Sequence, residues 1–249
     1  MKIKRAVIPA AGLGTRLRPV TEIIPKELLP IGTKPMIHTV IEELKEFGIE
    51  EIFIIINEKK EVIRTYLEKK FDGLFFGYQE SANGIPDAIL KAEEFVGKEN
   101  FALVMPDVVF FGENSLAQIV QKNKATEGNY FCLSGLVRIS ENDIEYFGYG
   151  KGLKVKVLKD KKGVFLVESF SSGKRELYMR ATGRGIFSPK IFDYIKRYRV
   201  PSSDRDLYDK VIAEGEKFYC YIISGKVFDV GIEKGYLRCQ EFLSRTRKK

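Results

Sequence analysis

Cysteine and histidine are scarce in this chain of 249 residues, and their scarcity excludes several kinds of chemistry. Its three cysteines, Cys132, Cys220 and Cys239, are far apart and form no C-x-x-C pair. An odd number at this spacing argues against a disulfide framework and against a zinc site. The one histidine, His38, falls within a predicted helix, so we expect it to be structural rather than part of a catalytic triad or acid–base pair.

Long apolar runs are also lacking. The first one ends at Pro9 and is too short for a signal peptide or a membrane span. With free cysteines and no targeting segment, we expect a cytoplasmic protein without a membrane partner. The hydrophobic fraction of 44% is ordinary for a globular protein, so the chain can bury a full core without disulfides or metals.

The net charge of +8 admits three classes of partner: nucleic acid, an anionic membrane or a small polyanion such as a nucleotide. Much of the excess lies in residues 159–162 and 245–249, and neither run is interleaved with aromatic residues that could stack on bases. We therefore interpret both as solvated segments and expect no nucleic-acid partner. A nucleic-acid-binding protein, the alternative, would lose affinity steeply with salt.

The first half of the chain alternates strand-like and helical patterns. Apolar residues at helical spacing before Gly48 predict a helix over residues 35–47. Further helices are predicted at 59–71 and 86–95, and strands at 4–9, 51–56, 74–78 and 101–105. This alternation is typical of a doubly wound sheet in which parallel strands are covered by helices on both faces.

The second half is more mixed. Strands are predicted at 131–137, 154–158, 164–168, 177–187 and 217–223, and helices at 189–197, 206–213 and 233–244. We predict an α/β fold with a Rossmann-like, mixed and mainly parallel sheet and helices on both faces. Residues 1–249 are expected to form a single domain, with a nucleotide-binding half at 1–110 and an acceptor-binding half at 111–249.

A glycine-rich turn follows the first predicted strand, at the sheet edge where α/β proteins bind ligands. Gly12 and Gly14 let backbone N–H groups approach an anion, and Thr15 and Arg16 add donors. The turn is neither a dinucleotide-binding fingerprint, because Leu17 replaces the last glycine, nor a P-loop. It predicts phosphate binding, with an ordinary turn as the alternative.

Three charged residues could complete such a site. Lys26 lies between Pro25 and Pro30, which stiffen its loop, and could act as a point charge for a triphosphate or be a solvated lysine. Asp107 and Asp229 each end an apolar run. Two such carboxylates could share one Mg²⁺ and leave its other positions to phosphate and water, or each could cap a turn.

These motifs together resemble a known family. Residues 12–16, 24–31 and 34–35 are similar to the signature of the sugar-1-phosphate nucleotidylyltransferases. The Ile-Pro-Lys-Glu form of residues 24–27 looks most like bacterial UTP–glucose-1-phosphate uridylyltransferases. The similarity continues through residues 79–84, 106–107, 146–149, 168 and 228–236, so it covers nearly the whole chain.

The resemblance implies a nucleotide-diphospho-sugar transferase fold and a Mg²⁺-dependent reaction of UTP with glucose 1-phosphate that yields UDP-glucose and pyrophosphate. It makes residues 111–249 the sugar-binding half and Arg16, Lys26 and Asp107 catalytic. The residues implied for the nucleotide are Ala11, Gly12, Gly14, Thr15, Arg16, Lys26, Gln79 and Gly84, the last two at the base. Those implied for the sugar are Gly148, Glu168, Gly183 and Arg184, and those for Mg²⁺ are Asp107 and Asp229.

One departure concerns the acceptor phosphate. The family pattern has Glu-Lys-Pro where this chain has Glu168-Ser169-Phe170, so a lysine expected on the sugar phosphate is missing. Lys174 or Arg184 could replace it. Two alternatives stay open: a thymidylyltransferase that uses dTTP, since a glutamine can read either pyrimidine, and a nucleotide-sugar sensor that has lost turnover. A homo-oligomer is compatible with the sequence.

Overall fold

The computed structural model describes residues 2–81, 83–123, 129–148, 152–157, 163–173, 179–199 and 203–246. Side chains are described throughout these ranges except at 152–157 and 171–173. Over these ranges, no helix combines the length and the apolar character needed to cross a membrane.

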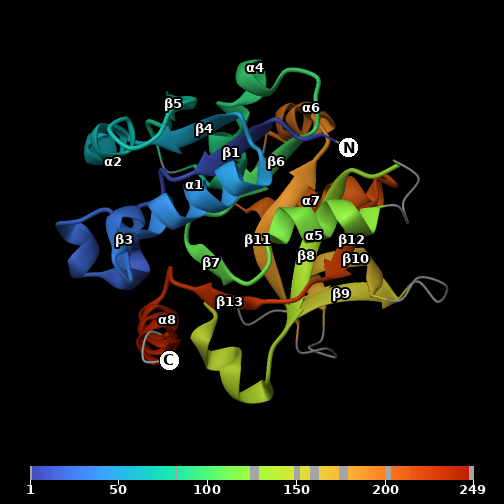
Figure 1. The fold of residues 1–249 in the computed structure, drawn as a ribbon. Helices are drawn as coiled ribbons and strands as arrows, with labels where there is room; N and C mark the ends of the chain where they lie inside the picture. The colour runs from blue at the N-terminus through green and yellow to red at the C-terminus, as the bar shows by residue number, and fades with distance from the viewer. Residues whose placement is uncertain are drawn as a thin grey trace.

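Nine strands of the described chain form one sheet in the order β5-β4-β1-β6-β11-β8-β12-β10-β9 (Figure 1). Their bounds are β1 Arg5–Pro9, β4 Glu51–Ile56, β5 Leu74–Tyr78, β6 Phe101–Val104, β8 Cys132–Arg138, β9 Gly152–Val157, β10 Val164–Gly173, β11 Met179–Phe187 and β12 Phe218–Ile222. Neighbours among β5, β4, β1 and β6 are parallel, as are β8 and β12. Only β11 and β10 run against the rest. The predicted mixed, mainly parallel sheet is confirmed.

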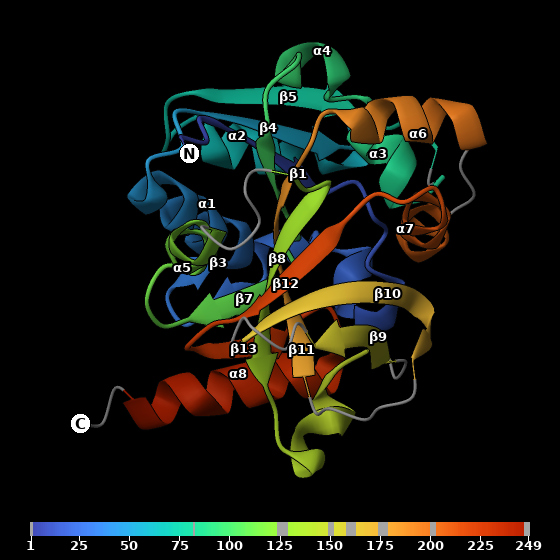
Figure 2. The ribbon, with the colours of Figure 1, turned by 90° about the vertical axis from the view of Figure 1, so that its right-hand side faces the viewer.

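Helices cover both faces of this sheet. Figure 2 shows α1 (Met36–Phe47) and α5 (Ser115–Lys122) on one side, and α6 (Lys190–Tyr198) and α7 (Asp204–Ala213) on the other. Successive side chains of a strand point to opposite faces. Accordingly Ala6 and Ile8 of β1 pack in the cluster that includes α1 and α5, and Val7 packs in the cluster that includes α6 and α7. Burial of each large aliphatic side chain contributes about 1.5–3 kcal/mol to these layers.

The first helix follows its predicted bounds because its ends carry the expected signals. Pro35 precedes it, and Gly48 ends it at φ 98°, a left-handed conformation in which its N–H reaches the carbonyls of Leu44 and Lys45.

The other elements are α2 Glu61–Leu67, α3 Ile85–Leu90, α4 Glu93–Val96, α8 Glu233–Thr246, the strand pair β2 Pro30–Ile31 with β3 Lys34–Pro35, and short 3₁₀ helices η1 Thr15–Leu17, η2 Val20–Glu22, η3 Lys26–Leu28, η4 Glu58–Lys60 and η6 Glu141–Tyr146.

One prediction about local structure was wrong, and one pair of strands was not predicted. The helix predicted at 86–95 is divided into α3 and α4, because Ala92 bonds back to Ile89 three residues earlier and tightens the turn between them. A two-stranded ribbon of β7 (Val108–Phe111) and β13 (Lys226–Asp229) was not foreseen. Val109 and Phe228 of this ribbon pack in a third cluster with α8, which fixes the ribbon beside the main sheet.

The scarce residue types are structural, as expected. The ring of His38 lies edge-on to Phe71, with centroids 4.6 Å apart, and its Nδ1 is 2.9 Å from the hydroxyl of Tyr66. All three cysteines are free and buried. Burial raises the pKa of the Cys220 thiol to about 12, so this thiol is protonated and unreactive at neutral pH.

Candidate active site

The glycine-rich turn lies directly after β1 and is held in a compact shape. Gly14 adopts φ 69°, and a Cβ there would come within 3.2 Å of the Thr21 side chain, so glycine is required on two grounds. The Thr21 hydroxyl donates to the Gly14 carbonyl at 2.8 Å. The chain then enters η1, which carries the half-exposed Arg16.

A buried lysine lies beneath this turn. The ammonium of Lys60 donates to the carbonyls of Ala10 (2.8 Å) and Gly12 (2.6 Å), and Asn57 donates to the carbonyl of Ala11 (2.7 Å). These peptides are trans, and a trans peptide points its N–H opposite to its C=O. The N–H groups that follow these three carbonyls therefore point away from the Lys60 and Asn57 donors, which gives the turn the character of an anion-binding nest.

The charge of Lys60 is balanced by Glu27, which belongs to the Pro-bracketed loop. Its carboxylate accepts from Lys60 at 2.7 Å, and no part of Glu27 is exposed. Burial lowers the pKa of Lys60, and Glu27 raises it only in part, so keeping this ammonium charged costs free energy. The pair joins two segments of the predicted site, the glycine-rich turn and the loop that carries Lys26.

Lys26, Arg16 and Asp107 form the next layer. Lys26 begins η3 after Pro25, and its Nζ is 2.6 Å from Oδ2 of Asp107, with Arg16 3.9 Å from the same oxygen. Burial alone would raise the pKa of Asp107, but the two cations outweigh it and hold the pKa below its usual value. Burial would lower the pKa of Lys26, but Asp107 and Glu27 together outweigh that effect and raise it. Lys26 and Asp107 are therefore both charged at neutral pH.

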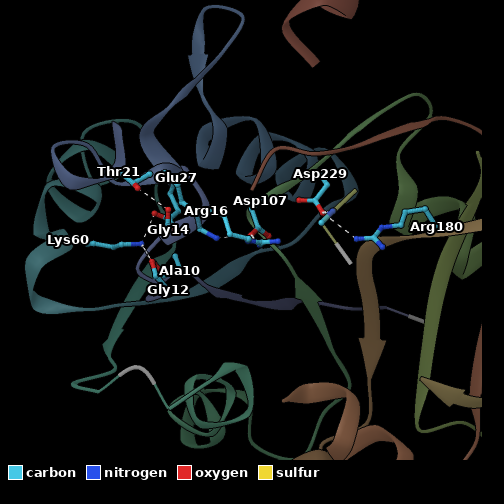
Figure 3. Close-up of polar contacts among 12 residues, drawn as sticks. Ala10, Gly12, Gly14, Arg16, Thr21, Glu27, Lys60, Asp107, Arg180 and Asp229 are labelled. Atoms are coloured by element: carbon cyan, nitrogen blue, oxygen red, sulfur yellow. Dashed lines mark hydrogen bonds and ion pairs between the residues drawn. The ribbon is translucent and has the colours of Figure 1, made fainter. Parts of the chain in front are cut away.

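Asp229 is brought to Asp107 by the ribbon that the sequence did not reveal. In its register Asp229 pairs with Val108, and the N–H of Val230 donates to the carbonyl of Asp107 at 2.9 Å. Asp229 is buried, with 4% of the residue exposed. Its Oδ2 accepts from the N–H of Gly148 at 2.9 Å and from Arg180 at 3.3 Å (Figure 3).

Some of these groups line a cavity of about 530 Å³ to which both halves of the chain contribute. Arg16, Gly84 and Asp107 come from residues 1–110, and Arg180 and Asp229 from the second half. A space of this size suits a nucleotide or a nucleotide sugar. With Arg16, Arg180 and the two aspartates on its wall and Lys26 bound to Asp107, the cavity can hold phosphate groups and a divalent cation.

The two aspartates fit Mg²⁺ in particular. Among the described residues, no group of three or more His, Cys, Asp or Glu side chains could hold a metal by itself. Mg²⁺ is usually bound through one or two carboxylates, with phosphate oxygens and waters as its other ligands. Asp107, directly before β7, and Asp229, at the end of the paired strand β13, both line one cavity and are donors of that kind.

Comparison with known proteins agrees with this chemistry. The sequence profile of the family described as nucleotidyl transferase matches residues 5–246. The chain belongs to the nucleotidyl transferase family. The resemblance drawn from the motifs is thereby confirmed, and the position of the motifs around one cavity gives this nucleotidyl transferase its candidate active site.

Relatives of this nucleotidyl transferase are similar over nearly their full length. The UTP–glucose-1-phosphate uridylyltransferase of Mycoplasma pneumoniae is 33% identical, with 95% of this chain and 91% of the relative covered. That of Mycoplasma genitalium is 31% identical, over 99% and 94%. Among solved structures, a UDP-glucose pyrophosphorylase complexed with UDP-glucose has a TM-score of 0.81 at 23% identity, over 98% of this chain and 100% of that one, and shares the fold.

Several predicted residues do lie at the cavity. Gly84 and Gly183 line it, and a Cβ at Gly183 would come within 2.9 Å of the Val108 side chain. Gly148 lies against Asp229 through its N–H. Gln79 is buried, and its amide nitrogen reaches the carbonyl of Gly84 (3.0 Å) and Asp87 (2.8 Å), so it shapes the loop expected to meet the base. Ala11 is buried within the turn, and Thr15 begins η1.

Other predictions are corrected or stay predictions. Arg184 lines the cavity, but it is not offered to a sugar phosphate in this structure, because its side chain is 1% exposed and binds Glu43 at 2.7 Å and the carbonyl of Thr182 at 3.0 Å. Glu168 is exposed on β10 and is not among the residues that line the cavity, so its role toward the sugar remains a prediction. Lys174 lies outside the described residues.

Three functional residues were missed. Lys60 stands in a Glu-Lys-Lys-Glu run that looks like an exposed helix start, and only its burial reveals its role. Glu27 was seen as part of the family motif without a function of its own. Arg180 was not singled out, although an arginine three residues before Gly183 in a predicted strand was a visible signal beside the missing lysine.

Proposed function

We propose that this nucleotidyl transferase joins UTP to glucose 1-phosphate and releases UDP-glucose and pyrophosphate. The observation that supports the proposal most is that Arg16, Asp107 and Asp229 line one cavity, with Lys26 2.6 Å from Asp107 and the glycine-rich turn directly before Arg16. The two mycoplasma relatives, which are named for this reaction, support the choice of UTP and glucose 1-phosphate.

In the proposed reaction an oxygen of the acceptor phosphate attacks the α-phosphorus of UTP, and pyrophosphate leaves from the opposite side. The N–H groups of the nest and Arg16 would hold the triphosphate, and Lys26 would neutralise charge that grows on the leaving pyrophosphate. Fixed donors and cations of this kind commonly lower a barrier by several kcal/mol. Asp107 and Asp229 would hold Mg²⁺, which when bound would offset charge on the phosphate oxygens.

The base and the sugar would lie on either side of this centre. Gly84, with its loop fixed by Gln79, would face the pyrimidine edge. Gly183 would let the sugar approach the floor of the cavity, where a side chain would collide with Val108. Gly148 would lie against the sugar beside Asp229.

The test is a matrix of UTP, dTTP, CTP, ATP and GTP against the 1-phosphates of glucose, galactose, mannose and N-acetylglucosamine with Mg²⁺, in which pyrophosphate release is measured. We expect the highest kcat/KM for UTP with glucose 1-phosphate. A highest value with dTTP would identify a thymidylyltransferase instead. Binding of nucleotide without release in every pairing would refute turnover and favour a sensor.

A further inference from the structure

The acceptor's phosphate needs a cation that the family pattern does not supply here. Where the pattern has lysine, this chain has Ser169, whose hydroxyl lies 3.2 Å from Asp209 of α7. The neighbouring N–H of Phe170 also bonds to Asp209, at 2.6 Å. This part of β10 is therefore turned toward an acidic side chain and carries no cation of its own. Arg205 of α7 lines the same cavity, but its Nη1 donates to the carbonyl of Phe170 at 3.3 Å.

Arg184 cannot fill the gap. Its guanidinium bonds to both carboxylate oxygens of Glu43, at 2.7 Å in the shortest contact, and to backbone carbonyls. A buried pair of this kind would have to break before Arg184 could meet a ligand, which would leave the charge of Glu43 uncompensated. The role of Arg184 is to join α1 to β11.

Arg180 is placed differently. It lies on β11 in register with Val137, lines the cavity and has a side chain that is 17% exposed. Its guanidinium carbon is 5.0 Å from the centre of the Phe147 ring, and its Nη2 is 3.3 Å from Asp229. Figure 3 shows Arg180 reaching the carboxylate pair from the side opposite to Arg16.

The position of Arg180 can be compared with the geometry of an in-line displacement. In an in-line displacement the attacking and leaving oxygens lie on opposite sides of the α-phosphorus. The glycine-rich turn and Arg16 lie on one side of the carboxylates in Figure 3 and suit the leaving pyrophosphate. The acceptor phosphate must then approach from the other side, which is where Arg180 lies.

We infer that Arg180 binds the phosphate of the sugar 1-phosphate and takes the place of the missing lysine. The inference rests on the proposed function. A guanidinium presents its N–H donors in a planar fork that suits the oxygens of a phosphate. The Phe147 ring supports the guanidinium plane and limits its direction.

The competing interpretation is that Arg180 only balances the charge of Asp229. The two roles differ in what they affect. A counter-ion would change stability and the response to both substrates alike, whereas a phosphate ligand changes the binding of the acceptor alone. Steady-state kinetics with UTP and glucose 1-phosphate varied in turn separate them.

The experiment compares Arg180→Gln and Arg180→Lys with the wild type. We expect Arg180→Gln to raise the KM for glucose 1-phosphate roughly 10- to 100-fold and to change the KM for UTP less than about twofold. Arg180→Lys keeps the charge without the fork and should fall between the two. Arg197→Gln is the matched control, because Arg197 is exposed on α6 and pairs with Glu214 away from the cavity.

A KM for glucose 1-phosphate that stays at the wild-type value in Arg180→Gln would overturn the inference, as would equal increases for both substrates. Thermal melting of each variant shows that the fold is kept, and Arg180→Lys gives the same comparison should the glutamine variant fail to fold. Absence of pyrophosphate release by the wild type would refute the proposed function itself and is seen before any variant is compared.

Discussion

Replacing Asp107 by asparagine is expected to lower kcat by roughly three orders of magnitude and to leave the fold intact. The change keeps the shape of the side chain but removes the negative charge that lies 2.6 Å from Lys26. It also removes one of two carboxylates proposed for Mg²⁺. Loss of a single group that stabilises the transition state commonly costs 10²- to 10³-fold, and loss of a metal ligand adds to that.

Pyrophosphate release measures this loss, and circular dichroism checks the fold. Asp229→Asn should behave in the same way, whereas Asp193→Asn, at an exposed position of α6, should keep wild-type rates. Near-wild-type turnover in both Asp107→Asn and Asp229→Asn would remove the proposed metal site. Because Lys26 and Arg16 outweigh burial and lower the pKa of Asp107 from its usual value, its carboxylate stays ionised from neutral pH into mild acid.

Replacing Lys60 by methionine is expected to destabilise the protein by about 3–5 kcal/mol, since it leaves the fully buried charge of Glu27 without a partner. For a chain of this size the melting temperature should fall by roughly 6–20 °C. The carbonyls of Ala10 and Gly12 also lose their donor. The turn is then less well held, and the KM for UTP should rise.

Lys59→Met is the matched control, because Lys59 is the exposed neighbour of Lys60 in η4 and its loss should change the melting temperature by little. The double variant Lys60→Met with Glu27→Met removes both buried charges and should regain much of the stability without regaining affinity for UTP. Equal melting temperatures for Lys60→Met and the wild type would show that the buried pair does not hold the turn.

Local patterns predicted much of the fold. β4 and β5 follow their predicted bounds because each is a short apolar run between clear turn signals, and α1 does so because a glycine ends it. The ribbon could not be predicted in the same way. Val108–Phe111 and Lys226–Asp229 are short apolar segments far apart in the chain, and neither shows from its own residues that the other is its partner.

The residues of the candidate site can be separated in the same way into those that were predicted and those that were not. Gly12, Gly14, Arg16, Lys26, Asp107 and Asp229 were found because they stand in motifs whose chemistry is visible in the residues. The role predicted for Arg184 toward the sugar phosphate did not foresee its pairing with Glu43. That partner is 141 residues away, and no sequence pattern shows that this arginine is buried. Lys60 was missed because a lysine is almost never fully buried unless it is paired, and its own segment does not show the partner.

The account depends on Asp107 and Asp229 sharing one cation beside the substrate phosphates. A crystal structure with Mn²⁺ and UDP-glucose, recorded at a wavelength where manganese scatters anomalously, tests this directly. We predict one anomalous peak within about 2.5 Å of a carboxylate oxygen from each aspartate and of a phosphate oxygen. A peak bound by neither aspartate, or the absence of any peak between them, would contradict the account.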